Sequence, residues 1–182
     1  PYLWMLRMSM LGVGVGFDTR GKGEVTIEQP SATGDTHTVG DSREGWAEAL
    51  GRLLGAYVGS DSLPSEWDLS EIRSAGTPLE SFGGYASGPE PLRKMLQTLH
   101  DLYERYIGQE VDSRLLVDTM NIIGRCVVAG GIRRSAQIAF GEPDDLEFLD
   151  LKQDEQKLSD YRWVSNNSIF AEVGMDYSEA AR

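Results

Sequence analysis

The chain has little cysteine and little histidine. Its 182 residues include one cysteine, Cys126, and two histidines, His37 and His100. A single thiol excludes an intrachain disulfide framework and any metal site with several thiolate ligands. The two histidines lack the short spacing that is typical of zinc ligands, so we expect no zinc site.

Long apolar runs and an excess of basic charge are also missing. No apolar stretch approaches the roughly 20 residues that span a bilayer, and no basic segment leads into a short apolar one as in a signal peptide. We therefore expect a cytoplasmic protein without membrane association. The formal net charge of -12 argues against a nucleic-acid binder, which needs a basic surface. A nucleotide ligand remains compatible, because one phosphate site needs only a few local cations.

The composition is that of a globular protein. Hydrophobic residues make up 40% and charged residues 25% of the chain, which suits one domain or a large piece of one. The chain starts at Pro1 without an initiator methionine and stops at Arg182, within a helix predicted after Asp176. We expect both ends to be cuts through a larger protein. The alternative is a processed or unusually short natural chain.

Apolar periodicity predicts helices and strands in mixed order, without repeats. Helices are expected at 3–10, 42–58, from Pro91 to Gly108, from Asp112 or Ser113 to Gly130, and at 144–152. Strands are expected at 11–17, 24–29, 69–74, 135–140 and 163–173, with polar or irregular loops at 30–40 and 59–67. This mixture predicts the α/β class.

Two glycine-containing segments invite a phosphate-binding interpretation. Residues 12–16 alternate glycine with valine but lack the Lys-Ser/Thr end of a Walker loop, so tight strand packing is favoured. In the segment Gly130, Gly131, Ile132, Arg133, Arg134, Ser135 and Ala136, the glycines permit close approach to a ligand. Arginine side chains suit phosphates and stack on bases. A helix end followed by solvated charges explains the same residues equally well.

Other polar residues leave two interpretations open. Arg73 lies near Gly76 and Pro78 and serves either a surface ion pair or a phosphate. Asn166 and Asn167 lie in a strand pattern, where asparagine is unusual, and either line a polar cavity or begin the strand. Cys126, on an apolar helix, is expected to be a buried structural thiol.

Six segments carry a resemblance to a known family. They are 12–17 (GVGVGF), 41–46 (DSREGW), 72–79 (IRSAGTPL), 82–89 (FGGYASGP), 121–136 (NIIGRCVVAGGIRRSA) and 162–168 (RWVSNNS). In this order they resemble the adenosylcobalamin-dependent (class II) ribonucleoside-triphosphate reductases. Each segment alone is a weak signal, but six in this order are hard to obtain otherwise, and the match extends over nearly the whole chain.

The resemblance implies an architecture and a chemistry. The family fold is a ten-stranded α/β barrel of two five-stranded halves around a finger loop, and residues 1–182 would supply part of the first half. The activity is reduction of ribonucleotides to deoxyribonucleotides by a cobalamin-initiated thiyl radical, with adenosylcobalamin as cofactor and thioredoxin as reductant. The radical cysteine would lie beyond Arg182 and one reducing cysteine before Pro1. This chain would then contain no catalytic residue and be inactive alone.

The resemblance also implies roles for particular residues. The segment from Gly130 to Ala136 would be the specificity loop between a deoxynucleoside triphosphate effector and the base of the ribonucleoside triphosphate substrate. Arg73 would bind an effector phosphate. Residues 23–69, with Asp41, Ser42 and Arg43 at the effector site, resemble an insertion that stands in for a dimer partner, so a monomeric parent is expected. Asn166 and Asn167 would lie near the substrate.

Two alternatives to the enzyme remain open from the sequence. One is a stand-alone deoxynucleotide-binding regulatory module without catalysis, in which the arginine segment binds the nucleotide. The other is a structural domain whose arginine segment is solvated.

Overall fold

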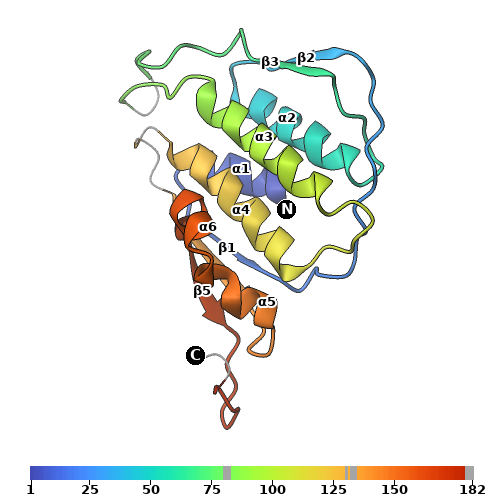
Figure 1. Ribbon diagram of the computed structural model, residues 1–182. Helices are drawn as coiled ribbons and strands as arrows, with labels where there is room; N and C mark the ends of the chain where they lie inside the picture. Colours follow the sequence, from blue (N-terminus) through green and yellow to red (C-terminus); the bar gives the residue numbers. More distant parts are fainter. Residues whose placement is uncertain (80–82, 130, 132–134, 179–182) are drawn as a thin grey trace.

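The computed structural model describes residues 1–79, 83–129, 131 and 135–178. Its helices are α1 Tyr2–Met10, α2 Arg43–Ala56, α3 Glu90–Glu104, α4 Ser113–Val128, α5 Leu146–Leu149 and α6 Glu155–Asp160, with 3-10 turns η1 Asp150–Gln153 and η2 Arg162–Val164. Its strands are β1 Val15–Asp18, β2 Thr36–Thr38, β3 Glu66–Asp68, β4 Gln137–Gly141 and β5 Ser165–Ile169. Figure 1 shows α1 to α4 gathered in one half, with α5, α6 and β5 below them.

The larger sheet has the order β1-β4-β5, and both of its strand pairs are parallel. Gln137, Ala139 and Gly141 of β4 are buried, whereas Ile138 and Phe140 between them are only partly buried. This alternation places one face of the sheet against the helices. On that face, Val117 of α4 and Ala139 share a core cluster.

The main core lies among the first four helices. Its fully buried members include Leu50 on α2, Leu99 on α3, and Leu115 and Ile123 on α4. Side-chain caps fix where two of these helices begin. The Asp112 carboxylate accepts from the Leu115 N–H at 2.6 Å at the start of α4, and Ser42 caps α2 in the same way.

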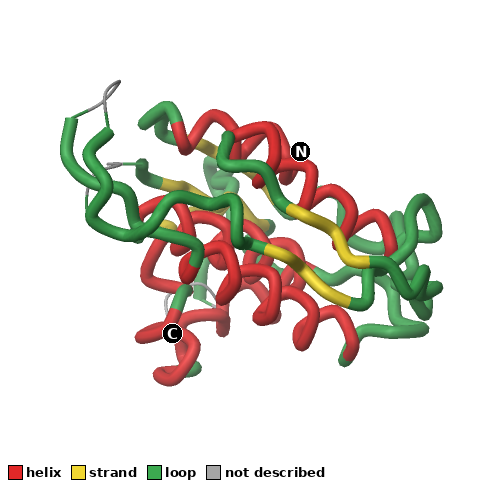
Figure 2. The backbone as a smooth tube through the Cα atoms, turned by 90° about the horizontal axis from the view of Figure 1, so that it is seen from above, coloured by secondary structure: helices red, strands yellow, loops and turns green. Residues whose placement is uncertain are grey.

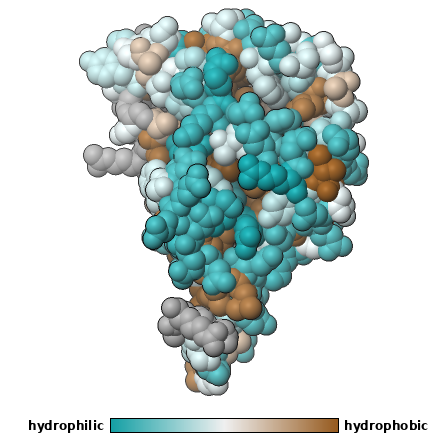
Figure 3. Space-filling model, viewed as in Figure 1, coloured by the Kyte–Doolittle hydropathy of each residue, from teal (hydrophilic) through white to brown (hydrophobic). Residues whose placement is uncertain are grey.

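A second, two-stranded sheet covers the outer side of the helices. Strands β2 and β3 pair in parallel, with Thr36 opposite Glu66 and Thr38 opposite Asp68. Figure 2 shows these strands running side by side, with helices beneath them. The face seen in Figure 1 is largely hydrophilic, with apolar residues in small separate patches (Figure 3).

Most predicted elements are confirmed. The helices expected at 3–10, at 42–58, from Pro91 and from Ser113 correspond to α1, α2, α3 and α4. The strands expected at 11–17 and 135–140 contain all but the last residue of β1 and of β4. The expected helix at 144–152 is present as the short α5 and η1, and the strand expected at 163–173 is shorter, as β5. The mixed helices and parallel strands agree with the α/β class. The helix predicted after Asp176 extends into residues 179–182, outside the described residues.

Two predicted strands and two loops are wrong. Residues 24–29 make only an isolated bridge, between Thr26 and Glu110, because Ile27 pairs with the turn after α3. Residues 69–74 form turns. The nearest strand is β3, which begins in the expected loop 59–67 and ends one residue after it. Strand β2 lies within the other expected loop, 30–40. The polar side chains of β2 and β3 do not give the sequence pattern that predicts a strand. Each strand forms by pairing with a partner that is distant in the sequence.

Candidate functional site

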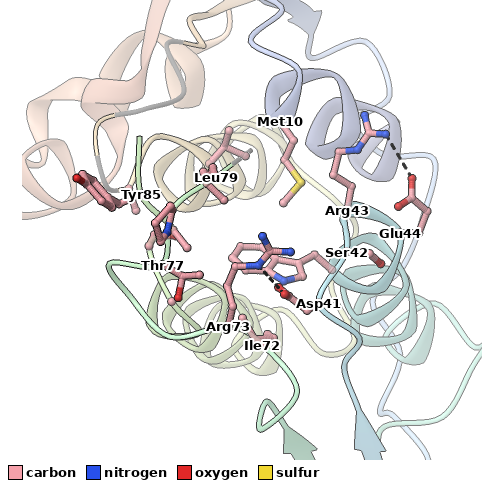
Figure 4. A pocket seen from close by; sticks show the side chains of 17 residues that line it. Met10, Asp41, Ser42, Arg43, Glu44, Ile72, Arg73, Thr77, Leu79 and Tyr85 are labelled. Atoms are coloured by element: carbon pink, nitrogen blue, oxygen red, sulfur yellow. Dashed lines mark hydrogen bonds and ion pairs between the residues drawn. The ribbon is translucent and has the colours of Figure 1, made fainter. Parts of the chain in front are cut away.

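A cavity of about 610 Å³ lies where several predicted site residues meet. Its lining comes from the ends of α1 and α4, the start of α2, and the two stretches 72–79 and 85–88 (Figure 4). The lining residues are Met10, Asp41, Ser42, Arg43, Glu44, Trp46, Ile72, Arg73, Thr77, Pro78, Leu79, Tyr85, Ala86, Ser87, Gly88, Val127 and Ala129. The volume is within the range usual for small-molecule sites.

The start of α2 forms one wall of the cavity. Ser42 has an extended backbone, and its Oγ accepts from the Gly45 N–H at 2.9 Å. A β-carbon at Gly45 would lie 2.4 Å from the Gly40 carbonyl oxygen, so glycine lets the preceding loop fold back over the helix. The first-turn N–H groups and the helix dipole favour an anion here.

Arg73 faces this helix start from the stretch 72–79. Its Nε donates to the Asp41 Oδ2 at 2.6 Å, and the two side chains are 43% and 30% exposed. The ion pair expected as one alternative for Arg73 is therefore present. It lies in the wall of a cavity, where Asp41 and Arg73 point toward each other (Figure 4).

The other charged pair of the cavity lies to one side. The Arg43 Nη2 is 3.8 Å from the Glu44 Oε1, and Figure 4 shows both side chains away from Arg73. Their side chains are 41% and 68% exposed. These four residues balance two positive charges with two negative ones, so the two pairs together add no net charge to the cavity wall.

A hairpin-like turn forms the opposite wall. Pro78 and Tyr85 make an antiparallel bridge, and the Gly76 N–H donates to the Ala86 carbonyl at 2.9 Å. Gly88 has a φ of +75°, and a β-carbon there would lie 2.9 Å from the Ala75 backbone nitrogen. The positive φ and the close contact explain glycine at this position.

Sequence reasoning missed several cavity residues. Tyr85 is 63% exposed at the rim and offers an aromatic face. Thr77 and Ser87 add hydroxyl groups to the lining. Trp46, on the buried side of α2, also lines the cavity and is 8% exposed. The glycine-rich, irregular stretch 83–89 was the sequence signal that could have directed attention to this wall.

The predicted specificity segment begins at the edge of the cavity. Ala129, which precedes it, is a lining residue, and Gly131 has a φ of +70°. At its other end the Ser135 Oγ donates to the Val13 carbonyl at 2.9 Å, and the Val15 N–H donates to the Ala136 carbonyl at 2.9 Å. Gly130, Ile132, Arg133 and Arg134 lie outside the described residues.

The two asparagines lie on the larger sheet rather than in the cavity wall. Asn166 and Asn167 of β5 are paired with Ile138 and Ala139 of β4. Asn166 is exposed, whereas the Asn167 Oδ1 accepts from the Ser165 Oγ at 3.0 Å. The structure therefore separates these residues from Asp41 and Arg73.

The remaining sequence expectations concern the thiol, metals and the membrane. Cys126 is 4% exposed on α4, as predicted for a structural thiol. Within the described residues, no group of His, Cys, Asp and Glu side chains is arranged to hold a metal ion. None of the helices that the structure describes has both the length and the hydrophobicity needed to cross a membrane.

Comparison with known proteins finds the same family by sequence and by structure. The family model for the insertion domain of B12-dependent ribonucleotide reductase matches residues 20–103. The chain is 48% identical, over 99% of its length, to the adenosylcobalamin-dependent ribonucleoside-triphosphate reductase of Euglena gracilis. It is 40% identical, over its whole length, to a probable enzyme of that name from Dictyostelium discoideum.

A solved structure agrees with the sequence comparisons. The crystal structure of a B12-dependent (class II) ribonucleotide reductase superposes with a TM-score of 0.78 at 28% identity. The match covers 94% of this chain and 29% of that one. The chain spans about a quarter of the curated relatives, 25% and 26% of their lengths. By sequence and by fold, the chain belongs to the adenosylcobalamin-dependent ribonucleotide reductase family.

Proposed function

We propose that this chain is the effector-sensing part of an enzyme that reduces ribonucleoside triphosphates, and that the cavity binds a deoxynucleoside triphosphate. The observation that carries this proposal is the cavity itself. Its lining combines Asp41, Ser42 and Arg43 from one part of the sequence with Arg73 from another and with Ala129, which precedes the predicted specificity segment.

The cavity has the chemistry that a nucleoside triphosphate needs. Phosphate oxygens would accept from the first-turn N–H groups of α2 and from the Arg73 guanidinium. In the described part of the chain, Arg73 contacts Asp41 through Nε alone, so its two terminal nitrogens remain available as donors. The exposed ring of Tyr85 and the hydroxyl of Thr77 offer contacts for the base and sugar.

The specificity segment would pass the identity of the effector to the substrate. Gly131 already adopts a positive φ that suits a glycine hinge. An effector base in the cavity would favour one conformation of residues 130–136, and Arg133 and Arg134 would present that conformation to the substrate base. This is a population shift between two sites that share one segment. Asn166, exposed on β5, and its neighbour Asn167 would lie near the substrate.

The whole enzyme would use adenosylcobalamin to start a thiyl radical reaction, with thioredoxin as reductant. The described residues do not fit that cofactor, since its corrin ring, nucleotide tail and adenosyl group far exceed a cavity of about 610 Å³. We therefore assign no cobalamin-binding residue and no catalytic residue to this chain. Its role would be binding and communication, and we expect it to be inactive alone.

An insertion would complete the effector site without a second subunit. The expected bounds are 23–69, and the matching insertion-domain model spans 20–103. In this proposal α2 replaces a helix of a dimer partner, so the parent enzyme, expected in the cytoplasm, would be monomeric. The reductase is preferred over a stand-alone regulatory module because the matched relatives carry the reductase name across the whole chain.

The experiment is a reduction assay of the full-length protein. With adenosylcobalamin, thioredoxin and a mixture of ribonucleoside triphosphates, the added deoxynucleoside triphosphate should set which base is reduced. In the double variant Arg133→Ala and Arg134→Ala, the effector should determine less strongly which base is reduced, while reduction continues. Reduction whose base choice ignores every deoxynucleotide would contradict the proposal, and absence of reduction would favour the stand-alone module.

A further inference from the structure

Four buried polar side-chain atoms on α1, α4 and β4 have no hydrogen-bond partner among the described residues. They are the Ser9 Oγ, both amide atoms of the Asn121 side chain and the Gln137 Oε1. The three residues are 0%, 1% and 4% exposed, respectively, so bulk solvent does not reach them. Since an unsatisfied buried polar group destabilises a fold, these atoms need a partner that the surrounding side chains do not supply.

The Gln137 side chain connects β4 with two helices. Its Nε2 donates to the Met120 carbonyl of α4 at 3.1 Å and lies 3.9 Å from the Met5 Sδ of α1. A β-carbon at Gly124 would lie 2.2 Å from that Nε2. Glycine at position 124 is therefore what allows Gln137 to reach α4.

The other two orphaned side chains lie on the helix faces that meet Gln137. Ser9 follows Met5 by four residues on α1, and Asn121 precedes Gly124 by three residues on α4. Residues three or four apart share a helix face. The three residues with unsatisfied atoms thus lie on the faces of α1 and α4 that meet Gln137, and on β4 itself.

The junction of α1, α4 and β4 at Gln137 lies at the end of the segment that joins α4 to β4. Ser135 and Ala136 are bonded to the backbone beside β1, through Val13 and Val15. Gln137 adds the connection back to α4, the helix from which the segment starts. Its side chain therefore holds the end of the segment against the body of α4.

We propose that Gln137, Asn121 and Ser9 enclose at least one internal water molecule, and that this hydrated joint positions the end of the α4–β4 segment. Water both donates and accepts, and it occupies buried sites that offer two to four polar partners. Gln137 is thereby a positioning residue for effector-dependent substrate choice. This regulatory role rests on the proposed function, whereas the hydration does not.

The hydration is tested by Asn121→Leu in the full-length reductase. Leucine has a similar size, so a dry junction would gain stability or stay unchanged when the unsatisfied amide is removed. A hydrated junction loses the hydrogen bonds of its water, and Tm should fall by several degrees. An unchanged or raised Tm would overturn the hydrated joint. A high-resolution crystal structure should show ordered water within hydrogen-bond distance of the Gln137 Oε1, and a dry junction there would also overturn it.

The positioning role is tested by Gln137→Met, which keeps the length of the side chain and removes both polar atoms. Effector-dependent base preference should fall about tenfold, while deoxynucleoside triphosphate affinity and effector-free activity stay within about twofold. Gln156→Met, an exposed glutamine on α6, is the matched control and should change none of these. Intact deoxynucleotide binding with unchanged base preference in Gln137→Met would refute the role and leave the proposed function standing.

Failure of the proposed function would look different. In that case the unmodified enzyme would not bind deoxynucleoside triphosphates or would show no effector-dependent preference. If Gln137→Met does not fold, Ser9→Ala removes a single hydroxyl from the same joint. A measurable loss of base preference in Ser9→Ala supports the joint, and unchanged preference with unchanged Tm overturns it.

Discussion

Two arginine–aspartate pairs hold very different regions of this molecule. At the junction of α4 with η2, Arg162 donates to both carboxylate oxygens of Asp118, at 2.6 Å and 2.7 Å, and the side chains are 3% and 0% exposed. In the cavity, Arg73 contacts one oxygen of Asp41, and the side chains are 43% and 30% exposed.

The difference separates an architectural arginine from one that is available to a ligand. Arg162 also donates to the Leu151 carbonyl, and the Tyr161 hydroxyl donates to Asp118. Such a buried, multiply bonded pair cannot change partners without leaving a charge uncompensated. Arg73 is solvated and singly bonded, so it can exchange Asp41 for a phosphate at little cost.

Breaking the buried pair should have the largest effect. Arg162→Ala leaves the Asp118 carboxylate buried without its cation, and we expect a loss of about 3–5 kcal/mol in the free energy of unfolding. Denaturant unfolding of the full-length protein measures it. The control is Arg93→Ala, whose 3.5 Å pair with Glu90 is 55% and 77% exposed. Equal effects of the two substitutions would contradict the comparison.

The second-largest loss of stability is expected where Gly45 packs closely against the Gly40 backbone, beside the cavity. In Gly45→Ala, the new methyl group would meet the Gly40 carbonyl oxygen, and the gain in helix propensity does not offset that clash. We expect a loss of about 1–2 kcal/mol. Gly40→Ala is the matched control, since a β-carbon at Gly40 has nothing within 4 Å among the described atoms. A neutral Gly45→Ala would show that the loop moves freely.

A third ion pair is intermediate, and it gives the comparison a pH dependence. The Lys22 Nζ lies 2.7 Å from the Asp145 Oδ2, with side chains 46% and 5% exposed. Burial alone would raise the pKa of Asp145, but hydrogen bonds from Lys22 and Ser113 outweigh burial and hold that pKa below 3.8.

A carboxyl group with a lowered pKa stabilises the fold above its unfolded pKa, and this contribution disappears as the pH falls through the folded pKa. We therefore expect Lys22→Met to be less stable than the unmodified protein at pH 7. The difference between the two proteins should shrink below about pH 4. Urea unfolding at several pH values measures the stability difference between the two proteins. A difference that grows on acidification would contradict this expectation.

The smallest effect on stability should come from the cavity pair. Arg73→Ala and Asp41→Ala each remove a solvated, singly bonded partner, so we expect changes of at most about 1 kcal/mol. Thermal unfolding of each variant is the measurement. A loss as large as that of Arg162→Ala would mean that Arg73 is architectural after all.

The sequence predicted the helices best, and for a physical reason. On α3, apolar residues repeat at helical spacing, as Leu92, Met95, Leu99 and Leu102 show, and Ser42 caps α2. Each of these signals can be read from a few neighbouring residues in the sequence. The ordinary β-strand signal failed for β2 and β3. These two strands carry threonine, histidine and acidic residues, and they form by pairing with each other although α2 separates them in the sequence.

The candidate site was predictable only in part. Motif resemblance singled out Asp41, Ser42, Arg43 and Arg73, and all four line the cavity. Tyr85 and Thr77 also line the cavity; the bridge between Pro78 and Tyr85 joins their two stretches, and Gly76, Gly83, Gly84 and Gly88 have positive φ. Such turns are specified by contacts across the turn rather than by residue periodicity.

The most direct test of the central claim is a calorimetric titration of the full-length protein with each deoxynucleoside triphosphate. The unmodified protein should bind at least one of them, and Arg73→Ala should weaken binding roughly 10- to 100-fold through loss of a charge-assisted phosphate contact. Arg93→Ala, outside the cavity, should bind as the unmodified protein does. Equal affinity of Arg73→Ala and the unmodified protein would contradict the assignment of the cavity.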